Sequence, residues 1–314
     1  MDKSENGQPE GLFEQIDARP AALQILRAHL RPLRKRLLRQ RVRLVSDVHD
    51  ARVEIRRARA ALGLCLPLLE QKRAQQLDRR LREIGRLLGP VRDLDVVMER
   101  SLGWGLERRG ESLVEFLYRV ARARHELVVE TERQLEAHFP AEQVRASRRL
   151  LGKGVVSGEA WRRSLEIEIR SALLSLAVPL ASIELAAGQD VPAPPVLEQW
   201  HQRRKVCRRL RYQLEMLGAD LHLRPAIDFL RGAQVRFGAV QDSAFIQGRI
   251  RDDLSQMMSR RLQRDLIERE QCVLGEALAE AKAWWSGPAG WERSAEAIIA
   301  ALSLPDEPED SLGA

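Results

Sequence analysis

A helical spacing of apolar residues runs through almost the whole chain, from about residue 21 to residue 302. Leu, Ala, Val and Ile recur every three or four positions, as they do on the buried face of an amphipathic helix. Aromatic residues are only 4% of the 314 residues, so the core must be aliphatic, which suits packed helices better than a β-sandwich. No segment has the alternation of a convincing strand. The sequence therefore predicts an all-α fold.

Prolines and glycines divide this periodicity into segments, because both residues are disfavoured inside helices. Pro32 is the exception, since it lies within the first segment and predicts a kink or a later helix start there. The helices expected from the pattern span residues 21–44, 47–66, 70–88, 93–106, 111–138, 141–150, 158–187, 196–217, 222–237, 240–283 and 289–302.

The two ends of the chain have the composition of disordered tails. Residues 1–11 are polar, and residues 304–314 contain four acidic residues and two prolines. The folded part is therefore expected over residues 12–303. A break in the pattern divides it into a first helical unit, residues 12–150, and a second, residues 151–303.

The overall charge narrows the class of partner. The net charge is +7 and the isoelectric point is about 9.8, a balance that favours polyanions such as nucleic acid, an anionic membrane or a phosphate polymer. The three cysteines are far apart and show neither a disulfide framework nor zinc-ligand spacing. The N-terminal residues lack a secretory leader, and no run of about 18 apolar residues occurs. We therefore expect a cytoplasmic protein without a membrane span, a metal or a cofactor.

One pattern of basic residues occurs twice. In VHDARVEIRRARAAL, residues 48–62, arginines follow His49 at offsets of 3, 7, 8 and 10 residues. In WHQRRKVCRRLRYQLEML, residues 200–217, arginines follow His201 at the same four offsets. An aspartate then follows each copy, 44 residues after the first histidine and 41 after the second. This match predicts two homologous helical units.

The offsets 0, 3, 7 and 10 fall on one side of a helix, because each residue turns it by about 100°. Aligned cations repel one another, and an exposed helix normally intersperses glutamates among them. Two basic stripes therefore predict an anionic ligand rather than a solvated face. The stripe residues are His49, Arg52, Arg56 and Arg59 in the first copy and His201, Arg204, Arg208 and Arg211 in the second.

The arginine at offset 8 points away from each stripe, so it is available for a structural ion pair. We expect Arg57 to pair with Asp93, and Arg209 to pair with Asp242. Each pair would tie the stripe helix to the segment that follows it in the same unit.

A further basic run lies just before the first stripe. Residues 18–46 contain no Asp or Glu, and the helix they form is expected to pack beside residues 47–66. Arg27, Arg31 and Arg34 have helical spacing and are predicted to extend the same basic surface.

The two stripe motifs resemble a known family. H-x-x-R-x-x-x-R-R-x-R at residues 49–59, R-D-L-D at residues 92–95 and H-x-x-R-K-x-x-R-R-L-R-Y at residues 201–212 are similar to the CHAD domain, the conserved histidine α-helical domain, over about residues 12–303. The resemblance implies two four-helix bundles related by a pseudo-twofold axis. It also implies a basic central cavity that binds inorganic polyphosphate, and members that are found at polyphosphate granules.

By position, the resemblance assigns a set of polyphosphate ligands: His49, Arg52, Arg56, Arg59, His201, Arg204, Lys205, Arg208, Arg211 and Tyr212. It implies a non-enzymatic binder whose further partners are other granule proteins. The chain departs from the family pattern in having QDSA where a second R-D-x-D would stand. It also lacks the N-terminal E-x-E-x-K strand of the catalytic domain that is often fused to these domains, so an enzymatic role is not supported.

Other functions stay open at this point. A nucleic-acid binder would fit the charge, although the stripes carry little aromatic interleaving for base stacking. A phosphate-processing enzyme could use His49 or His201, with Mg²⁺ on the DLD aspartates Asp93 and Asp95. A helical scaffold could present Trp284, Trp285 and Trp291 to a partner. If the two stripe histidines contact phosphate, binding is expected to tighten at mildly acidic pH.

Overall fold

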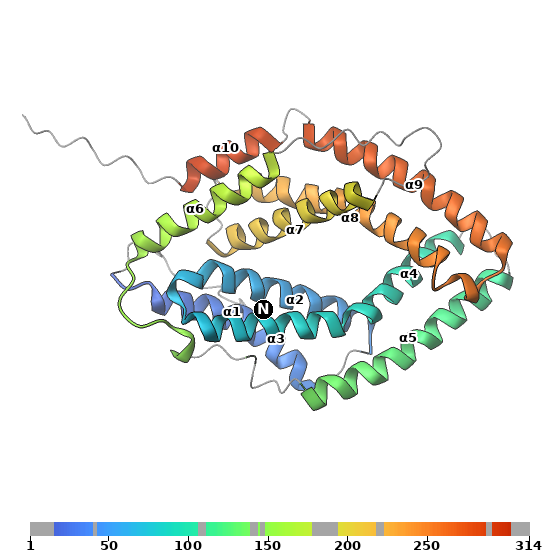
Figure 1. The fold of residues 1–314 in the computed structure, drawn as a ribbon, viewed down its shortest axis with the longest axis horizontal. Helices are drawn as coiled ribbons and strands as arrows, with labels where there is room; N and C mark the ends of the chain where they lie inside the picture. The colour runs from blue at the N-terminus through green and yellow to red at the C-terminus, as the bar shows by residue number, and fades with distance from the viewer. Residues whose placement is uncertain are drawn as a thin grey trace, which may run out of the picture.

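The computed structural model describes residues 16–39, 43–105, 111–138, 144, 148–177, 194–217, 223–286 and 291–302. The prediction of an all-α fold is confirmed, since nearly all of these residues form α-helices (Figure 1). The expected tails, residues 1–11 and 304–314, lie outside the described residues. The helices are α1 (Arg19–Arg39), α2 (Val45–Cys65), α3 (Gln71–Leu87), α4 (Gly89–Gly105), α5 (Glu111–His138), α6 (Gly158–Ala177), α7 (Pro194–Leu217), α8 (Arg224–Arg251), α9 (Arg260–Ser286) and α10 (Trp291–Leu302).

Two predicted helix boundaries are wrong. The break expected at Gly238 does not occur, because α8 continues through this glycine to Arg251. The continuous helix expected over residues 240–283 is instead interrupted after Asp252, whose φ of −96° and ψ of −97° are not helical. In the described part of residues 141–150, the only regular element is a short 3₁₀ turn, Arg148–Leu150.

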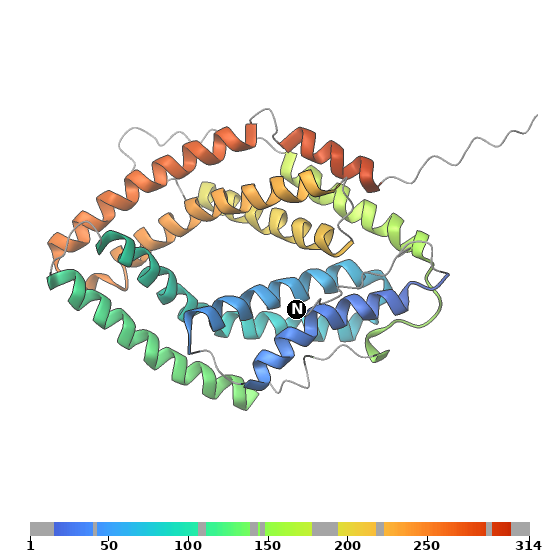
Figure 2. The ribbon, with the colours of Figure 1, turned by 180° about the vertical axis from the view of Figure 1, so that it is seen from behind.

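Pro32 lies inside α1, which runs through it from Arg19 to Arg39. Proline removes one backbone hydrogen bond and crowds the preceding turn, which bends a helix. Figure 2 shows the bend in α1. Of the two outcomes predicted for Pro32, the structure therefore has the kink and not the later start.

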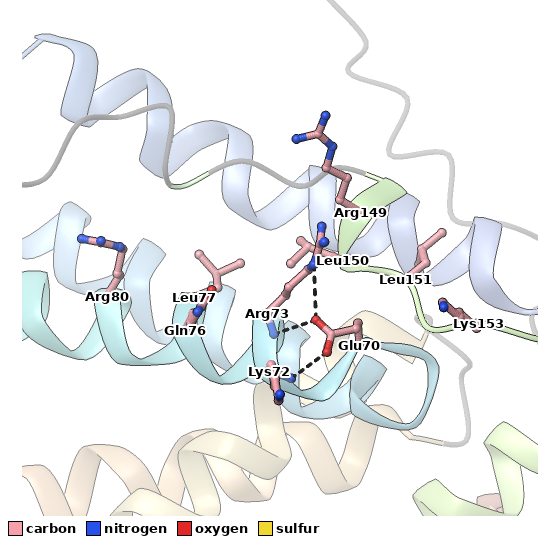
Figure 3. Close-up of a pocket in the computed structure, with 10 residues that line it drawn as sticks. All are labelled: Glu70, Lys72, Arg73, Gln76, Leu77, Arg80, Arg149, Leu150, Leu151 and Lys153. Carbon is pink, nitrogen blue, oxygen red and sulfur yellow. Dashed lines mark hydrogen bonds and ion pairs between the residues drawn. The ribbon is translucent and has the colours of Figure 1, made fainter.

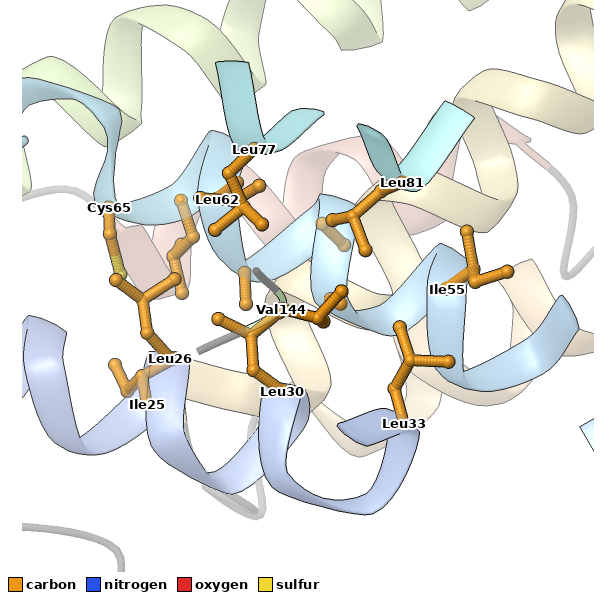
Figure 4. Close-up of a cluster of buried hydrophobic side chains, with 14 of the residues drawn as sticks. Ile25, Leu26, Leu30, Leu33, Ile55, Leu62, Cys65, Leu77, Leu81 and Val144 are labelled. Atoms are coloured by element: carbon orange, nitrogen blue, oxygen red, sulfur yellow. The ribbon is translucent and has the colours of Figure 1, made fainter. Parts of the chain in front are cut away.

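Buried side chains form three hydrophobic clusters. The first joins α1, α2 and α3 and includes residues of α5, α6 and α7, and Figure 4 shows Leu26, Leu30, Ile55 and Leu81 in it. The second joins α7, α8, α9 and α10 with the later part of α6. The third packs α4 and α5 of the N-terminal half against α8 and α9. Truncating a fully buried leucine such as Leu30 to alanine would cost about 2–5 kcal/mol of folding free energy.

The tryptophans proposed above as a partner surface belong to the second cluster. Trp285 stacks on Trp291 with ring centroids 5.1 Å apart, and Trp284 stacks on Phe229 at 5.9 Å. Trp285 and Trp291 are each 7% exposed. These aromatic rings pack α8, α9 and α10 together, which is the role of packing residues rather than of a partner surface.

No helix among the described residues is both long enough and apolar enough to cross a membrane. All three cysteines are free thiols, with Cys65 and Cys207 buried and Cys272 exposed.

Candidate polyanion site

The two stripe helices, separated by some 150 residues in sequence, pack against each other. α2 contacts α7 near the middle of the molecule (Figure 1). On α2 the buried residues Val48, Ile55 and Ala58 face the first cluster, and on α7 Cys207 and Leu210 face the second. The apolar faces thus turn the helices so that their basic faces meet between the two cores.

Four stripe arginines meet there, and we refer to Arg52, Arg56, Arg204 and Arg208 as the central arginine cluster. Burial, followed by the neighbouring charges of Arg52 and Arg204, lowers the pKa of Arg56 to about 10. Burial, followed by Arg56 and Arg204, also lowers the pKa of Arg208 to about 10. Both guanidinium groups remain protonated at neutral pH, so the cluster keeps its positive charge despite its own repulsion.

The inner pair of the cluster lacks counter-charges. Within the described part of the chain, neither Arg56 nor Arg208 forms an ion pair. The phenol of Tyr212, itself only 4% exposed, is the one neighbour that raises the pKa of either group. Half-buried cations without carboxylates are costly for a folded protein, so their retention points to an anion supplied from outside.

The outer pair of the cluster is anchored by the protein. Arg52 donates from Nη1 to the carbonyl oxygen of Gly85 at 3.0 Å. Burial lowers the pKa of Arg52, and the nearby carboxylate of Asp93 partly opposes this effect. Arg204 donates from Nη1 to Oε1 of Gln241 at 2.8 Å. These contacts fix where the two guanidinium groups point.

A glycine lies over each outer arginine. A Cβ atom at Gly89 would be 3.6 Å from Nη1 of Arg52, and one at Gly238 would be 3.1 Å from Nη2 of Arg204. These glycines begin two matching segments, GPVRD at residues 89–93 and GAVQD at residues 238–242. Besides the two aspartates, the shared G-x-V-x-D spacing in the sequence marks both glycines and Gln241, which were not predicted as site residues. Matching contacts at matching positions are what a duplicated unit would produce.

The predicted structural ion pairs need correction. Arg57 lies with its guanidinium 5.7 Å from the ring centroid of Tyr212, whereas Asp93 lies near Arg52 and Arg249, which oppose the rise in its pKa caused by burial. The expected pair between Arg57 and Asp93 does not form.

In the second half, Arg209 and Asp242 also have other partners than the predicted ones. Asp242 lies 3.6 Å from Arg204, and Arg209 lies 4.0 Å from Glu168 of α6. The expected pair between Arg209 and Asp242 is therefore absent as well. Offset 8 turns Arg57 toward Tyr212 of α7 and Arg209 toward Glu168 of α6, rather than toward the aspartates on α4 and α8.

The remaining stripe residues lie at the edge of the cluster. Arg59 donates from Nε to Asp78 of α3 at 2.7 Å. Arg211 stacks over Tyr212 at 4.6 Å and lies 3.7 Å from Glu215. Both arginines are thus partly neutralised by the protein, unlike Arg56 and Arg208.

The histidines and the lysine assigned by resemblance differ in their surroundings. His201 is half-buried and its Nδ1 accepts a hydrogen bond from the side-chain amide of Gln241. His49 and Lys205 are exposed and form no hydrogen bond or ion pair with a described residue. A role for these three side chains in binding stays a prediction.

The basic run on α1 does not extend the cluster. Leu26, Leu30 and Leu33 of α1 face the first core, and Arg27 and Arg31 are exposed on the opposite side of the helix. Arg34, in contrast, is half-buried, and its Nε is shielded from solvent. The prediction that Arg27 and Arg31 line the α2 surface is therefore wrong, since packing turns these two outward, whereas a role for Arg34 stays a prediction.

The aspartates proposed as a magnesium site are separated by their contacts. Asp95 is fully buried and is bound by Nε of Arg124, so it joins α4 to α5. Among the described residues, no group of three or more His, Cys, Asp or Glu side chains is arranged to hold a metal ion.

Comparisons with known proteins agree with this architecture. A family model described as the CHAD domain matches residues 19–251. The structure is similar to PptA from Streptomyces chartreusis, with a TM-score of 0.62 and 18% identity, covering 86% of this chain and 100% of that one. It is also similar to the CHAD domain from the plant Ricinus communis, with a TM-score of 0.58 and 22% identity, covering 93% and 95% of the two chains. No curated protein sequence matches.

Proposed function

Because the chain belongs to the CHAD domain family, which is associated with polyphosphate binding, we propose that it binds inorganic polyphosphate at the central arginine cluster without transforming it. The observation that carries this proposal is that no carboxylate among the described residues pairs with Arg56 or Arg208. Two helices from different parts of the chain hold these cations against each other. An anionic chain threaded between them would relieve the repulsion.

The chemistry of arginine suits this ligand. Each guanidinium presents planar N–H groups that bind phosphate oxygens in pairs, and it stays charged when partly buried. Polyphosphate carries about one charge per phosphate, so consecutive phosphates can engage consecutive arginines. Binding would release counterions and would therefore weaken steeply with salt, as it does for nucleic acids.

Two other functions receive less support. The aromatic ring of Tyr212 lies beside the cluster, but it is buried and covered by Arg211 and Arg57, so it offers no platform for stacking on nucleic-acid bases. A phosphate-transferring enzyme would need an activated nucleophile beside the arginines. His49 is exposed, and Nδ1 of His201 is occupied by Gln241. Association with polyphosphate granules is part of the proposal and follows from the ligand.

The decisive experiment compares two double variants of equal charge. Arg56→Met with Arg208→Met removes the inner cations while keeping much of their apolar length, whereas Arg27→Met with Arg31→Met removes two outward cations from α1. We expect the first variant to weaken binding of long-chain polyphosphate by about 100-fold or more at fixed salt, since hydrogen bonds to charged groups contribute about 1.5–3 kcal/mol each. We expect the second to change binding by less than about threefold. Equal losses in both variants would overturn the proposal.

Two further measurements separate the alternatives. In competition at fixed salt, polyphosphate should displace bound RNA or DNA, and excess nucleic acid should not displace polyphosphate. Incubation of the protein with polyphosphate and Mg²⁺ should release no phosphate. If nucleic acid displaced polyphosphate instead, the protein would be a nucleic-acid binder. Steady release of phosphate that is abolished by Arg56→Met with Arg208→Met would support an enzyme.

A further inference from the structure

A second basic site lies on the outside of the first half, away from the central arginine cluster. A pocket of about 990 Å³ is formed between α3 and the segment that precedes α6 (Figure 3). Its volume is in the range of small-molecule sites. The lining residues are Glu70, Lys72, Arg73, Gln76, Leu77, Arg80, Arg149, Leu150, Leu151 and Lys153.

The charges around this pocket are strongly unbalanced. Five basic residues and one acidic residue line it. The acid, Glu70, is already engaged, because its carboxylate accepts from the backbone N–H groups of Lys72 at 3.2 Å and Arg73 at 3.0 Å and lies 3.3 Å from Nε of Arg73. Glu70 therefore caps α3 and neutralises one arginine.

The other four basic side chains lack partners. Lys72, Arg80, Arg149 and Lys153 form no ion pair or side-chain hydrogen bond with any described residue. Elsewhere on the surface, arginines are commonly paired one helical turn away, as Arg163 is with Glu159. Four cations that have no partner among the described residues therefore line one concavity.

The backbone that carries these cations is held in place. Leu69 and Leu151 form an antiparallel bridge, in which the N–H of Glu70 donates to the carbonyl of Leu150 at 2.8 Å and the N–H of Gly152 donates to that of Leu68 at 3.0 Å. Next to Lys153, Gly154 has a φ of +84°, a left-handed conformation that favours glycine. Arg149 and Lys153 are thus presented from a fixed segment.

We propose that this pocket binds the oligophosphate group of a small ligand. Phosphate oxygens would contact Lys72, Arg149 and Lys153 at the rim, and Arg80 would supply charge from α3. The floor of Leu77, Leu150 and Leu151 leaves room for an apolar moiety beside the phosphates. The same chemistry is offered by a short inorganic polyphosphate and by a nucleoside triphosphate. This site does not depend on the function proposed for the central arginine cluster.

The test uses the full chain in the Arg56→Met, Arg208→Met background, where the central arginine cluster is disabled. Tripolyphosphate and ATP without metal are each titrated by calorimetry against this protein. Arg149→Met with Lys153→Met is then added, and Arg27→Met with Arg31→Met is added separately as the charge-matched control. We expect the pocket variant to lose at least tenfold in affinity and the control to lose less than threefold.

The outcomes separate the two proposals. Stronger binding of ATP than of tripolyphosphate assigns the site to nucleotides, and the reverse assigns it to short polyphosphate. Failure of both probes to bind, or equal losses in the pocket variant and the control, overturns the pocket proposal. Neither of these results affects the proposed function, which is tested with long-chain polyphosphate in the wild-type background. Arg149 and Lys153 are exposed, so loss of folding would not explain a loss of binding.

Discussion

The two stripe helices have the same pattern of charges but use it differently. In the first half, Arg52 is held by a backbone carbonyl and lies near the half-buried Asp93. In the second half, Arg204 is held by the side chain of Gln241, which also binds His201. The residue matching Gln241 is Arg92, a cation that pairs with Glu99. Equal spacing in sequence thus fixes where the arginines lie, while single neighbours decide how firmly each is held.

The strongest test of the equivalence between the halves uses the inner pair. Burial and like charges lower the pKa of Arg56 and of Arg208 to about 10 in both cases, so each should contribute equally to binding. We expect Arg56→Met and Arg208→Met, made singly, each to weaken polyphosphate binding by about 10- to 100-fold. We also expect each to raise the free energy of unfolding by about 0.5–2 kcal/mol, because a repelling cation is removed.

Binding isotherms and urea unfolding of the two single variants provide the measurement. Arg59→Met and Arg211→Met serve as controls, since these arginines already have carboxylates nearby and should not gain stability. Losses that differ by more than tenfold between Arg56 and Arg208 would show that the halves do not share the ligand equally.

The second test concerns the anchors of the outer pair. Gln241→Ala removes hydrogen bonds to both Arg204 and His201, and we expect it to lower the free energy of unfolding by about 1–2 kcal/mol. Arg92→Ala removes an ion pair with Glu99, which is 52% exposed, and should change stability by less than about 0.5 kcal/mol. Urea unfolding of both variants decides the matter. If Arg92→Ala proved the more damaging change, the second half would not be the more firmly anchored one.

The sequence was sufficient for the fold class because helical periodicity and the start and stop signals are local. The helix boundary predicted at Gly238 is wrong, because this glycine lies inside α8, where the lack of a side chain makes room for Arg204. The real interruption after Asp252 carries no glycine or proline, so no local signal marked it.

The site was predictable only in part. Stripe geometry selected Arg52, Arg56, Arg204 and Arg208 because rotation about a helix axis follows from spacing alone. The partners of Arg57 and Arg209, which are the Tyr212 ring and Glu168, were missed because they depend on how separate helices pack. The outward direction of Arg27 and Arg31 was likewise set by which face of α1 buries its leucines.

The third test compares the two matched glycines. A methyl group at position 238 would lie 3.1 Å from Arg204, whereas one at position 89 would lie 3.6 Å from Arg52, an ordinary contact. Replacing glycine by alanine within a helix normally stabilises the folded protein by roughly 1 kcal/mol, and Gly238→Ala should show little of this stabilisation. It should also weaken polyphosphate binding by about threefold. Gly89→Ala should leave binding unchanged. Thermal unfolding and binding isotherms measure both, and a Gly238→Ala variant with full helical gain and intact binding would show that Arg204 is not confined.

The smallest expected effect concerns the offset-8 arginines, which also differ between the halves. Arg209 pairs with Glu168, whereas Arg57 acts on His29 of α1. Burial, and then the charge of Arg57, lowers the pKa of His29 below 6.5. As the pH falls below about 6.5, His29 is protonated in the unfolded chain before it is protonated in the folded protein. The free energy of unfolding therefore decreases from about pH 6.5 down to the pKa of His29 in the folded state. Between pH 7.5 and pH 5, the free energy of unfolding should decrease less in His29→Gln than in the wild type. The decrease in Arg57→Ala should lie between these two. An identical fall in wild type and Arg57→Ala would mean that the charge of Arg57 is screened by solvent, and an identical fall in wild type and His29→Gln would mean that the pKa of His29 is not lowered in the folded protein.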